Sequence, residues 1–274
     1  MKIAVLSDIH GNLPALESTL SEIYKENINQ IIFLGDLITD FAQYTNEVLR
    51  IVRSTSLNVI RGNREGYLIH QSNNPNDDTW DKYKQFSTNK NTFEHLSKDD
   101  ISYISALPQQ LTFAFDNNFY VRAVHGSPFS EFDTIYSDNI ELINRSLNEI
   151  EENILLCGHT HRPFIHSVGE KTLINVGSVG LNFDREQCAH YTVIQYENGD
   201  VKINMKKAKY DYDAFKRSCD LNDPWVRLCL KSMEDGVNYN MRFLEEAKKC
   251  CGTWPIPNEI YNNLFHDWCG RGIV

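Results

Sequence analysis

The 274-residue sequence predicts an α/β fold, and three observations support that prediction. Short apolar segments alternate with amphipathic ones, beginning with KIAVL and continuing with apolar residues at helical spacing. Each apolar segment of the N-terminal part ends in a cluster of Gly, Asp, Asn or His. Strands that alternate with helices are joined by right-handed crossovers and form a largely parallel sheet. The composition, with 41% hydrophobic and 23% charged residues, is that of a globular protein.

The N-terminal part contains three predicted strand units. The expected elements are a strand from Lys2, a helix from about Pro14, a strand at 30–34, a helix at 44–52 and a strand at 57–60. Open α/β sheets bind ligands at the carboxyl ends of their strands, where the polar clusters of this sequence fall. Taken one at a time, such clusters are also ordinary turn sequences.

The remainder of the chain divides into three parts. Residues 64–107 are polar, with aromatic and aliphatic residues at helical spacing, and predict a helical insertion. Further strands are expected at 110–115, 119–124, 154–157, 164–168, 173–176, 189–196 and 201–205, with a hairpin turn at Asn117-Asn118 and a helix at 138–150. From Lys206 onward the sequence is helical and aromatic. We therefore expect a core over 1–205 and a helical C-terminal extension over 206–274.

Charge and cysteine content restrict the partners. There are 27 Lys and Arg against 37 Asp and Glu, a net charge of −10, so no stable nucleic-acid binding is expected. The seven cysteines lack C-x-x-C spacing and indicate reduced thiols. The sequence shows neither a secretory leader nor an apolar stretch of membrane length. We expect a cytoplasmic protein that is not bound to a membrane; a homo-oligomer is compatible with the sequence.

Five polar clusters at predicted strand ends are candidates for a metal site. They are Asp8-x-His10, Gly35-Asp36, Gly62-Asn63, His125-Gly126 and Gly158-His159-x-His161. In an extended segment residues i and i+2 face the same side, so each D-x-H or H-x-H pair can point to one region. Imidazoles, carboxylates and an amide oxygen suit borderline divalent metals rather than an all-oxygen calcium site. Because a carboxylate can bridge two ions, Asp36 is the natural shared ligand.

In this order, D-x-H, G-D, G-N, H-G and G-H-x-H resemble the motifs of the calcineurin-like metallophosphoesterases. HGN at 10–12, GHTHRP at 158–163 and NVGSVG at 175–180 are similar to the bacterial phosphodiesterase and diadenosine-tetraphosphatase-like branch of that family. The resemblance covers residues 1 to about 205. It implies a four-layer α-β-β-α sandwich of two mixed sheets.

The resemblance also implies two divalent transition-metal ions, with manganese or iron as first candidates and zinc, cobalt or nickel as others. By position, the ligands of one ion are Asp8, His10 and His161, those of the other are Asn63, His125 and His159, and Asp36 bridges both. A hydroxide between the ions would attack phosphorus without a covalent phosphoenzyme. The expected catalytic residues are Asp36, Asn63, Arg64 and His125, and the expected substrate-binding residues are Asn63, Arg64 and Arg162.

The sequence departs from the family pattern at position 64. Many members have a histidine after the G-N pair, which is credited with protonating the leaving group or stabilising the transition state, whereas this chain has Arg64. Arginine binds phosphate oxygens but is a poor proton donor. We expect charge stabilisation in place of general acid catalysis, which favours good leaving groups such as nucleotides. Arg162 either contacts substrate phosphate or pairs with an acidic neighbour.

Together these features predict a dinuclear-metal-dependent phosphohydrolase that cleaves phosphodiester or phosphoanhydride bonds in a small nucleotide-like substrate, such as diadenosine tetraphosphate or ATP. The alternatives are a protein serine/threonine phosphatase and a non-catalytic scaffold on the same fold; the filled ligand positions argue against the scaffold. The aromatic extension either packs on the sheet as structural helices or caps the site, with an aromatic side chain stacked on a nucleobase.

Overall fold

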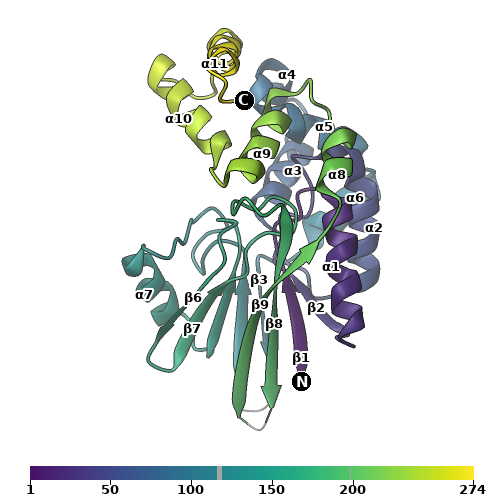
Figure 1. Ribbon diagram of the computed structural model, residues 1–274, viewed down its shortest axis with the longest axis vertical. Coiled ribbons are helices and arrows are strands. Elements are labelled where there is room, and N and C mark those ends of the chain that lie inside the picture. Colours follow the sequence, from purple (N-terminus) through teal and green to yellow (C-terminus); the bar gives the residue numbers. More distant parts are fainter. Residues whose placement is uncertain (116–118, 198) are drawn as a thin grey trace.

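The computed structural model describes residues 1–115, 119–197 and 199–274, and contains two mixed sheets between layers of helices (Figure 1). The four-stranded sheet has the order β2 (Gln30–Phe33), β1 (Lys2–Leu6), β8 (Cys188–Glu197), β9 (Asp200–Lys209). The five-stranded sheet has the order β3 (Gln110–Ala114), β4 (Tyr120–Val124), β5 (Ile154–Cys157), β7 (Lys171–Asn175), β6 (Phe164–Val168). Strands β1 and β2 are parallel, as are β4, β5 and β7, whereas the other pairs are antiparallel.

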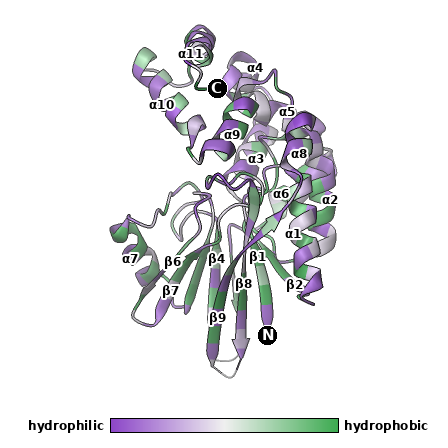
Figure 2. Cartoon of the chain, in the orientation of Figure 1, coloured by the Kyte–Doolittle hydropathy of each residue, from purple (hydrophilic) through white to green (hydrophobic). Residues whose placement is uncertain are grey.

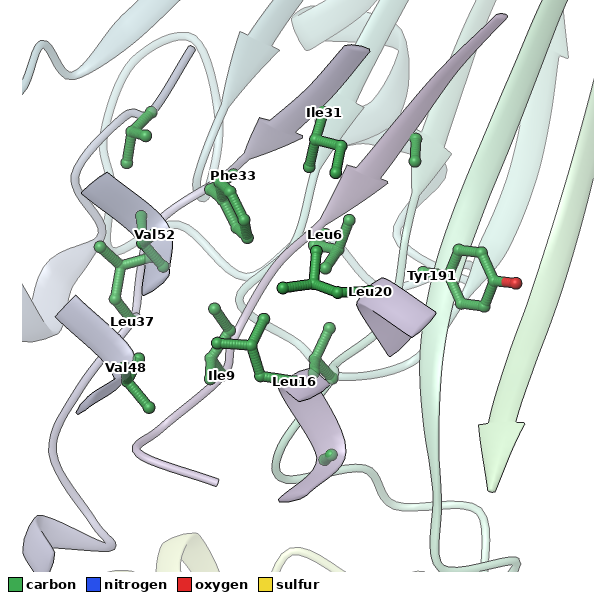
Figure 3. Close-up of a cluster of buried hydrophobic side chains, with 14 of the residues drawn as sticks. Leu6, Ile9, Leu16, Leu20, Ile31, Phe33, Leu37, Val48, Val52 and Tyr191 are labelled. Carbon is green, nitrogen blue, oxygen red and sulfur yellow. The ribbon is translucent and has the colours of Figure 1, made fainter. Parts of the chain in front are cut away.

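Alternation along the strands builds the layers. In β1, Ile3 and Val5 belong to an apolar cluster that joins the two sheets, whereas Ala4 and Leu6 belong to the cluster beneath the helices. Figure 3 shows Leu6 beside Leu20, with other residues of that second cluster around them. In Figure 2 the strands β1 and β2 are mostly green, whereas β9 carries both green and purple segments. Both faces of β1 are therefore buried, one against the other sheet and one against helices, which agrees with the predicted four-layer sandwich.

The helices fall into three groups along the chain. One sheet is covered by α1 (Leu13–Lys25) and α2 (Thr45–Thr55), and the other by α7 (Ile140–Glu149). Asn12 caps α1, because its side chain accepts a hydrogen bond from the backbone N–H of Ala15. The insertion contains α3 (Asn63–Asn73), α4 (Thr79–Lys82), α5 (Ser87–His95) and α6 (Lys98–Ala106). The C-terminal helices are α8 (Tyr212–Ser218), α9 (Pro224–Asp235), α10 (Tyr239–Cys251) and α11 (Asn258–Gly270).

The C-terminal helices lie beyond the strand ends, beside the insertion (Figure 1). Phe215 and Trp225 share a buried cluster with Phe41 and Leu181 of the core. Helices α10 and α11 form a second cluster with Leu228 of α9. The insertion bonds to this extension, since the side chain of Gln85 accepts from the backbone N–H of Ile256. Within the described ranges, no helix is both long and apolar enough to cross a membrane.

The structure corrects two predicted strands and leaves one turn undescribed. Residues 57–60 form only an isolated bridge between Val59 and Phe33, because Leu57 is 97% exposed and the chain turns away after Ile60. Strand β9 continues past Met205 to Lys209, since the long antiparallel pairing with β8 holds it extended. The predicted turn at residues 117 and 118 lies outside the described residues.

Candidate metal centre

Seven polar side chains meet where strands of both sheets end. Asp8 follows β1, Asp36 follows β2, His125 follows β4, His159 and His161 follow β5, and Asn63 begins α3; His10 lies two residues beyond Asp8. All seven are the residues that the sequence selects as ligands. The parallel pairs β1–β2 and β4–β5 bring their carboxyl ends to one edge, so loops from both sheets converge there.

Asp8, His10 and His161 form one group of potential ligands, and all three are buried. The Nε2 atoms of His10 and His161 are 3.1 Å apart, and His161 Nε2 lies 3.2 Å from Asp8 Oδ1. Asp8 Oδ1 has no hydrogen-bond partner in the part of the chain that the structure describes. A buried carboxylate oxygen that faces two imidazole nitrogens suits a divalent transition metal.

Asp36, His125 and His159 form the second group. Asp36 Oδ2 lies 3.4 Å from His125 Nε2, and Asn63 Oδ1 lies 3.1 Å from the same nitrogen. Asp36 Oδ2 is also 3.9 Å from His10 Nε2, so this carboxylate stands between the two groups. One carboxylate is therefore close to imidazole nitrogens of both groups.

The backbone turns sharply at most of these residues. Asp8, His10, Asp36, His159 and His161 all have positive φ angles, between 50° and 64°. Such angles are uncommon for residues other than glycine and cost on the order of 1–3 kcal/mol each. The surrounding sheets and loops hold the strained turns, and the turns aim the side chains into one small volume.

Two glycines explain why several ligands follow Gly in the sequence. A Cβ on Gly158 would lie 2.5 Å from Asp8 Oδ2, and a Cβ on Gly62 would lie 2.2 Å from Asp36 Oδ1. Both distances are shorter than the 3.0 Å below which Cβ atoms essentially never approach another heavy atom. The G-H-x-H and G-N motifs therefore need glycine because the neighbouring loop's carboxylate passes directly over the backbone.

Outer contacts orient the imidazoles. His125 Nδ1–H donates to the carbonyl of Leu34 at 2.7 Å, and His161 Nδ1–H donates to the carbonyl of Leu181. His10 Nδ1 lies 2.7 Å from Asp40 Oδ2. Because the Nδ1 atoms of these three rings face acceptors outside the site, their Nε2 atoms face inward, which is the usual arrangement of histidines that bind metal.

Burial and charge shift the pKa values of these groups in different directions. Burial lowers the pKa of His10, but Asp40 and other acidic neighbours raise it to about 9. Burial likewise lowers the pKa of His125, which Asp36 raises to about 10. Burial and the charge of His125 lower the pKa of His159 to about 4. A metal must displace protons from the first two rings, so metal affinity is expected to increase with pH.

Residues 1–199 match the calcineurin-like phosphoesterase superfamily domain. This chain belongs to that superfamily. It is thus a metallophosphoesterase, a metal-dependent phosphoester hydrolase, as its motifs predicted. An uncharacterised protein of Methanocaldococcus jannaschii is 26% identical over 231 residues, which cover 76% of this chain and 88% of that protein.

Two crystal structures share the fold. A metallophosphoesterase from Sphaerobacter thermophilus has a TM-score of 0.67 and 23% identity, and the match covers 86% of this chain and 100% of that one. A hypothetical protein from Pyrococcus horikoshii has the same TM-score and identity, with 83% and 97% of the two chains covered. Both matches extend beyond the superfamily domain, so they include part of the C-terminal extension.

Five of the seven predicted ligand residues line a cavity of about 330 Å³, namely His10, Asp36, Asn63, His159 and His161. Arg64 lines this cavity, and its guanidinium lies 3.2 Å from Asp40 Oδ2. Arg162 is exposed, and its guanidinium donates to the carbonyl of Gly236 at the end of α9. The structure thus places Arg64 beside the proposed ligands and shows Arg162 bonded to the extension.

Sequence reasoning missed two buried acidic residues beside the metallophosphoesterase site, Asp40 and Glu65. Glu65 could have been noticed, because a Glu three residues after Gly62 is at the capping-box position of a helix. Asp40 carries no such signal. Burial raises the pKa of Asp40, but the Arg64 guanidinium and contacts with His10 and Trp225 bring it well below its usual range.

A third group of potential ligands lies outside the cavity and consists of Asp184, Cys188 and His190. Asp184 already bonds to His190 Nε2 at 2.6 Å and to Lys207 Nζ at 2.9 Å. Because the ammonium group neutralises the carboxylate, this group is explained as a structural ion pair. That agrees with the sequence, which offers no strand-end motif around His190.

Proposed function

We propose that this metallophosphoesterase hydrolyses phosphodiester or phosphoanhydride bonds in small nucleotide-like substrates and uses two divalent transition-metal ions. The observation that carries the proposal is the pair of ligand groups beside a cavity that aromatic side chains also line. Diadenosine tetraphosphate and ATP are the substrates proposed first. A cytoplasmic location is part of the proposal, supported by seven free cysteines.

The proposed ligands form two sets, one for each ion, according to the distances between their side-chain atoms. In this proposal Asp8, His10 and His161 would hold one ion, Asn63, His125 and His159 would hold the other, and Asp36 would be available to both. Manganese or iron is proposed first, because imidazole and carboxylate ligands suit these metals. When bound, two such ions act as Lewis acids on phosphoryl oxygens and lower the pKa of water.

The chain's own residues bind and orient the substrate in this proposal. Arg64 extends from the start of α3 into the cavity, where its guanidinium binds phosphoryl oxygens and stabilises the charge of the transition state. The Asp40 carboxylate forms an ion pair with this guanidinium and so restricts its position. Arg162 is proposed as a second phosphate ligand, once it releases the carbonyl of Gly236.

An aromatic rim favours a substrate that carries a base. Tyr67 and Phe132 are 38% and 50% exposed at the cavity, and their ring centroids are 5.7 Å apart. Met241 of the extension, 51% exposed, lies on the same cavity. A flat nucleobase buries such apolar surface, and stacking on an aromatic ring contributes about 1–3 kcal/mol. The extension over 206–274 is accordingly proposed as a partial cap, and this rim makes a nucleotide a better candidate than a phosphopeptide.

The proposed activity is tested by screening the manganese-loaded protein against diesters, nucleotides, dinucleoside polyphosphates and phosphopeptides. We expect the highest kcat/KM on a nucleotide or dinucleoside polyphosphate and loss of activity in Asp36→Asn, which removes the shared carboxylate. Activity that survives Asp36→Asn contradicts the proposed site. Preference for phosphopeptides would favour the protein phosphatase alternative, and wild-type protein that binds fewer than two ions and has no activity would favour the scaffold.

The rim is tested separately with Phe132→Ala. This substitution should raise KM for ATP about tenfold and leave KM for tripolyphosphate, which has no base, nearly unchanged. The matched control is Phe129→Ala in the same loop, because Phe129 packs under the Arg145 guanidinium. Equal effects of Phe132→Ala on both substrates would show that the ring does not bind the base.

A further inference from the structure

Asp40 connects three elements beside the site. It is fully buried, and its backbone also has a positive φ of 59°. Its Oδ2 atom lies 2.7 Å from His10 Nδ1 and 3.2 Å from the Arg64 guanidinium. One carboxylate thus contacts a proposed metal ligand and the proposed phosphate-binding residue.

The other oxygen of Asp40 contacts the C-terminal extension. Trp225 Nε1–H donates to Asp40 Oδ1 at 2.6 Å, across 185 residues of sequence. Asp223 and Pro224 begin α9 immediately before it, and the Asp223 side chain accepts from the Trp225 backbone N–H at 2.8 Å. The start of α9 is therefore fixed, and the indole N–H is aimed at the carboxylate.

We infer that Trp225 is a positioning residue of the active site: its indole N–H fixes the Asp40 carboxylate, which in turn orients His10 toward the metal and Arg64 toward substrate phosphate. The inference rests on the proposed metal-dependent function. It gives the extension a part in metal binding that is separate from its proposed part as a cap.

The extension itself provides the comparison that separates positioning from packing. Trp268 is also buried, at 2% exposure against 6% for Trp225, but its Nε1 has no hydrogen-bond partner among the described residues. Both indoles fill apolar clusters, yet only Trp225 is bonded to a carboxylate beside the proposed metal ligands. The N–H of Trp225 therefore has a role that apolar packing does not require.

The test measures Mn²⁺ binding to the full chain by titration calorimetry, without substrate. Trp225→Phe should weaken one of two Mn²⁺ sites about tenfold, as expected when an outer partner of a metal-bound histidine is loosened, and leave the other unchanged. Trp268→Phe, the matched control, should change neither site. If Trp225→Phe does not fold by circular dichroism, benzothienylalanine at position 225 removes only the N–H and is measured in its place.

A double-mutant cycle with Asp40→Asn tests whether Trp225 affects metal binding through Asp40. If Trp225 acts through Asp40, Trp225→Phe should change Mn²⁺ affinity less than twofold in the Asp40→Asn background. Wild-type affinity in Trp225→Phe, an equal loss in Trp268→Phe, or the same tenfold loss in both backgrounds would overturn the inference. A wild-type protein that binds no metal contradicts the proposed function instead, so the two failures are distinguishable.

Discussion

Glu65 joins the two loops that carry the central ligands. Its Oε2 accepts from the backbone N–H groups of Gly62 and Asp36, at 2.8 and 2.9 Å, and its Oε1 accepts from that of Leu37 at 2.9 Å. The side chain is fully buried. A single carboxylate thereby holds Asp36 beside the start of α3, where Asn63 begins the helix.

Glu65→Gln should destabilise the protein and weaken metal binding together. The amide NH2 group cannot accept a hydrogen bond, so at least one buried backbone N–H loses its partner. We expect a loss of about 1.5–3 kcal/mol in the free energy of unfolding, measured by urea titration. Glu149→Gln, at an exposed position in α7, is the control. A Glu65→Gln protein as stable as this control would show that the three hydrogen bonds are not important.

Arg64 allows a test of the predicted change from acid catalysis to charge stabilisation. Arg64→Ala should lower kcat/KM for nucleotides about 100-fold, the usual effect of removing one transition-state donor. The wild-type enzyme should also cleave alkyl monophosphates much more slowly than substrates with nucleotide leaving groups, because arginine does not donate a proton. Equal rates on the two substrate classes would contradict this role.

The seven proposed ligands could be predicted because each depends on local sequence. Asp8 and Asp36 follow short apolar strands, and glycine marks the places where a loop passes over a carboxylate, as at Gly158. Asp40 and Trp225 could not be predicted, since their pairing exists only after the extension packs on the core. Sequence patterns thus reveal ligands on strand ends but not the residues that support them.

At the scale of elements, the wrongly predicted strand boundaries depend on hydrogen bonding to neighbouring strands, which the local sequence does not show. Three of the residues 57–60 are apolar, but only Val59 bridges to β2, so no strand forms. The polar end of β9 looks non-strand in isolation and is held by its pairing with β8, where Ala208 opposes Ala189. Buried strands such as β1 are predicted well because both of their faces are apolar.

Glu152 links the edge of the five-stranded sheet to the loop before β5. Its carboxylate accepts from Thr112 Oγ1 of β3 at 2.8 Å and from Arg122 Nε of β4 at 2.9 Å. Burial raises the pKa of Glu152, but the hydrogen bonds from Thr112 and the contacts with Arg122 bring it below its ordinary value of 4.5. The ionised form is therefore the one that stabilises this edge.

Glu152→Gln should cost about 1.5 kcal/mol at pH 7, because it removes the charged acceptor of the Thr112 hydroxyl and of the partly exposed Arg122 guanidinium. Since the folded-state pKa is lowered, the contribution is fully present above the unfolded value of about 4.5 and is lost as the pH falls through the folded value. Urea unfolding of both proteins at pH 7 and near pH 4 measures this difference. A gap that stays constant over this range would contradict a role for the charge.

At the scale of the whole molecule, the core and extension share one buried cluster. The Phe215 ring of α8 meets the Phe41 ring edge-on, with centroids 4.8 Å apart, and both residues are buried. Leu181 and Trp225 pack into the same cluster. Phe41 of this cluster follows Asp40 directly in the chain. Unfolding of the extension would therefore expose the loop that carries Asp36 and Asp40. We expect one cooperative unit rather than two independent ones.

Phe215→Ala tests this cooperativity. Loss of the buried ring should cost about 3–5 kcal/mol in the free energy of unfolding.

Two spectroscopic signals distinguish the parts of the molecule. Three of the four tryptophans, Trp225, Trp254 and Trp268, lie in the extension and Trp80 lies in the insertion, so fluorescence follows the helical layers. Far-UV circular dichroism follows the sheets as well. If the molecule is one unit, both signals shift to lower temperature together in Phe215→Ala, whereas exposed Leu221→Ala shifts neither. A fluorescence transition that precedes the dichroism transition would mean that the extension unfolds alone.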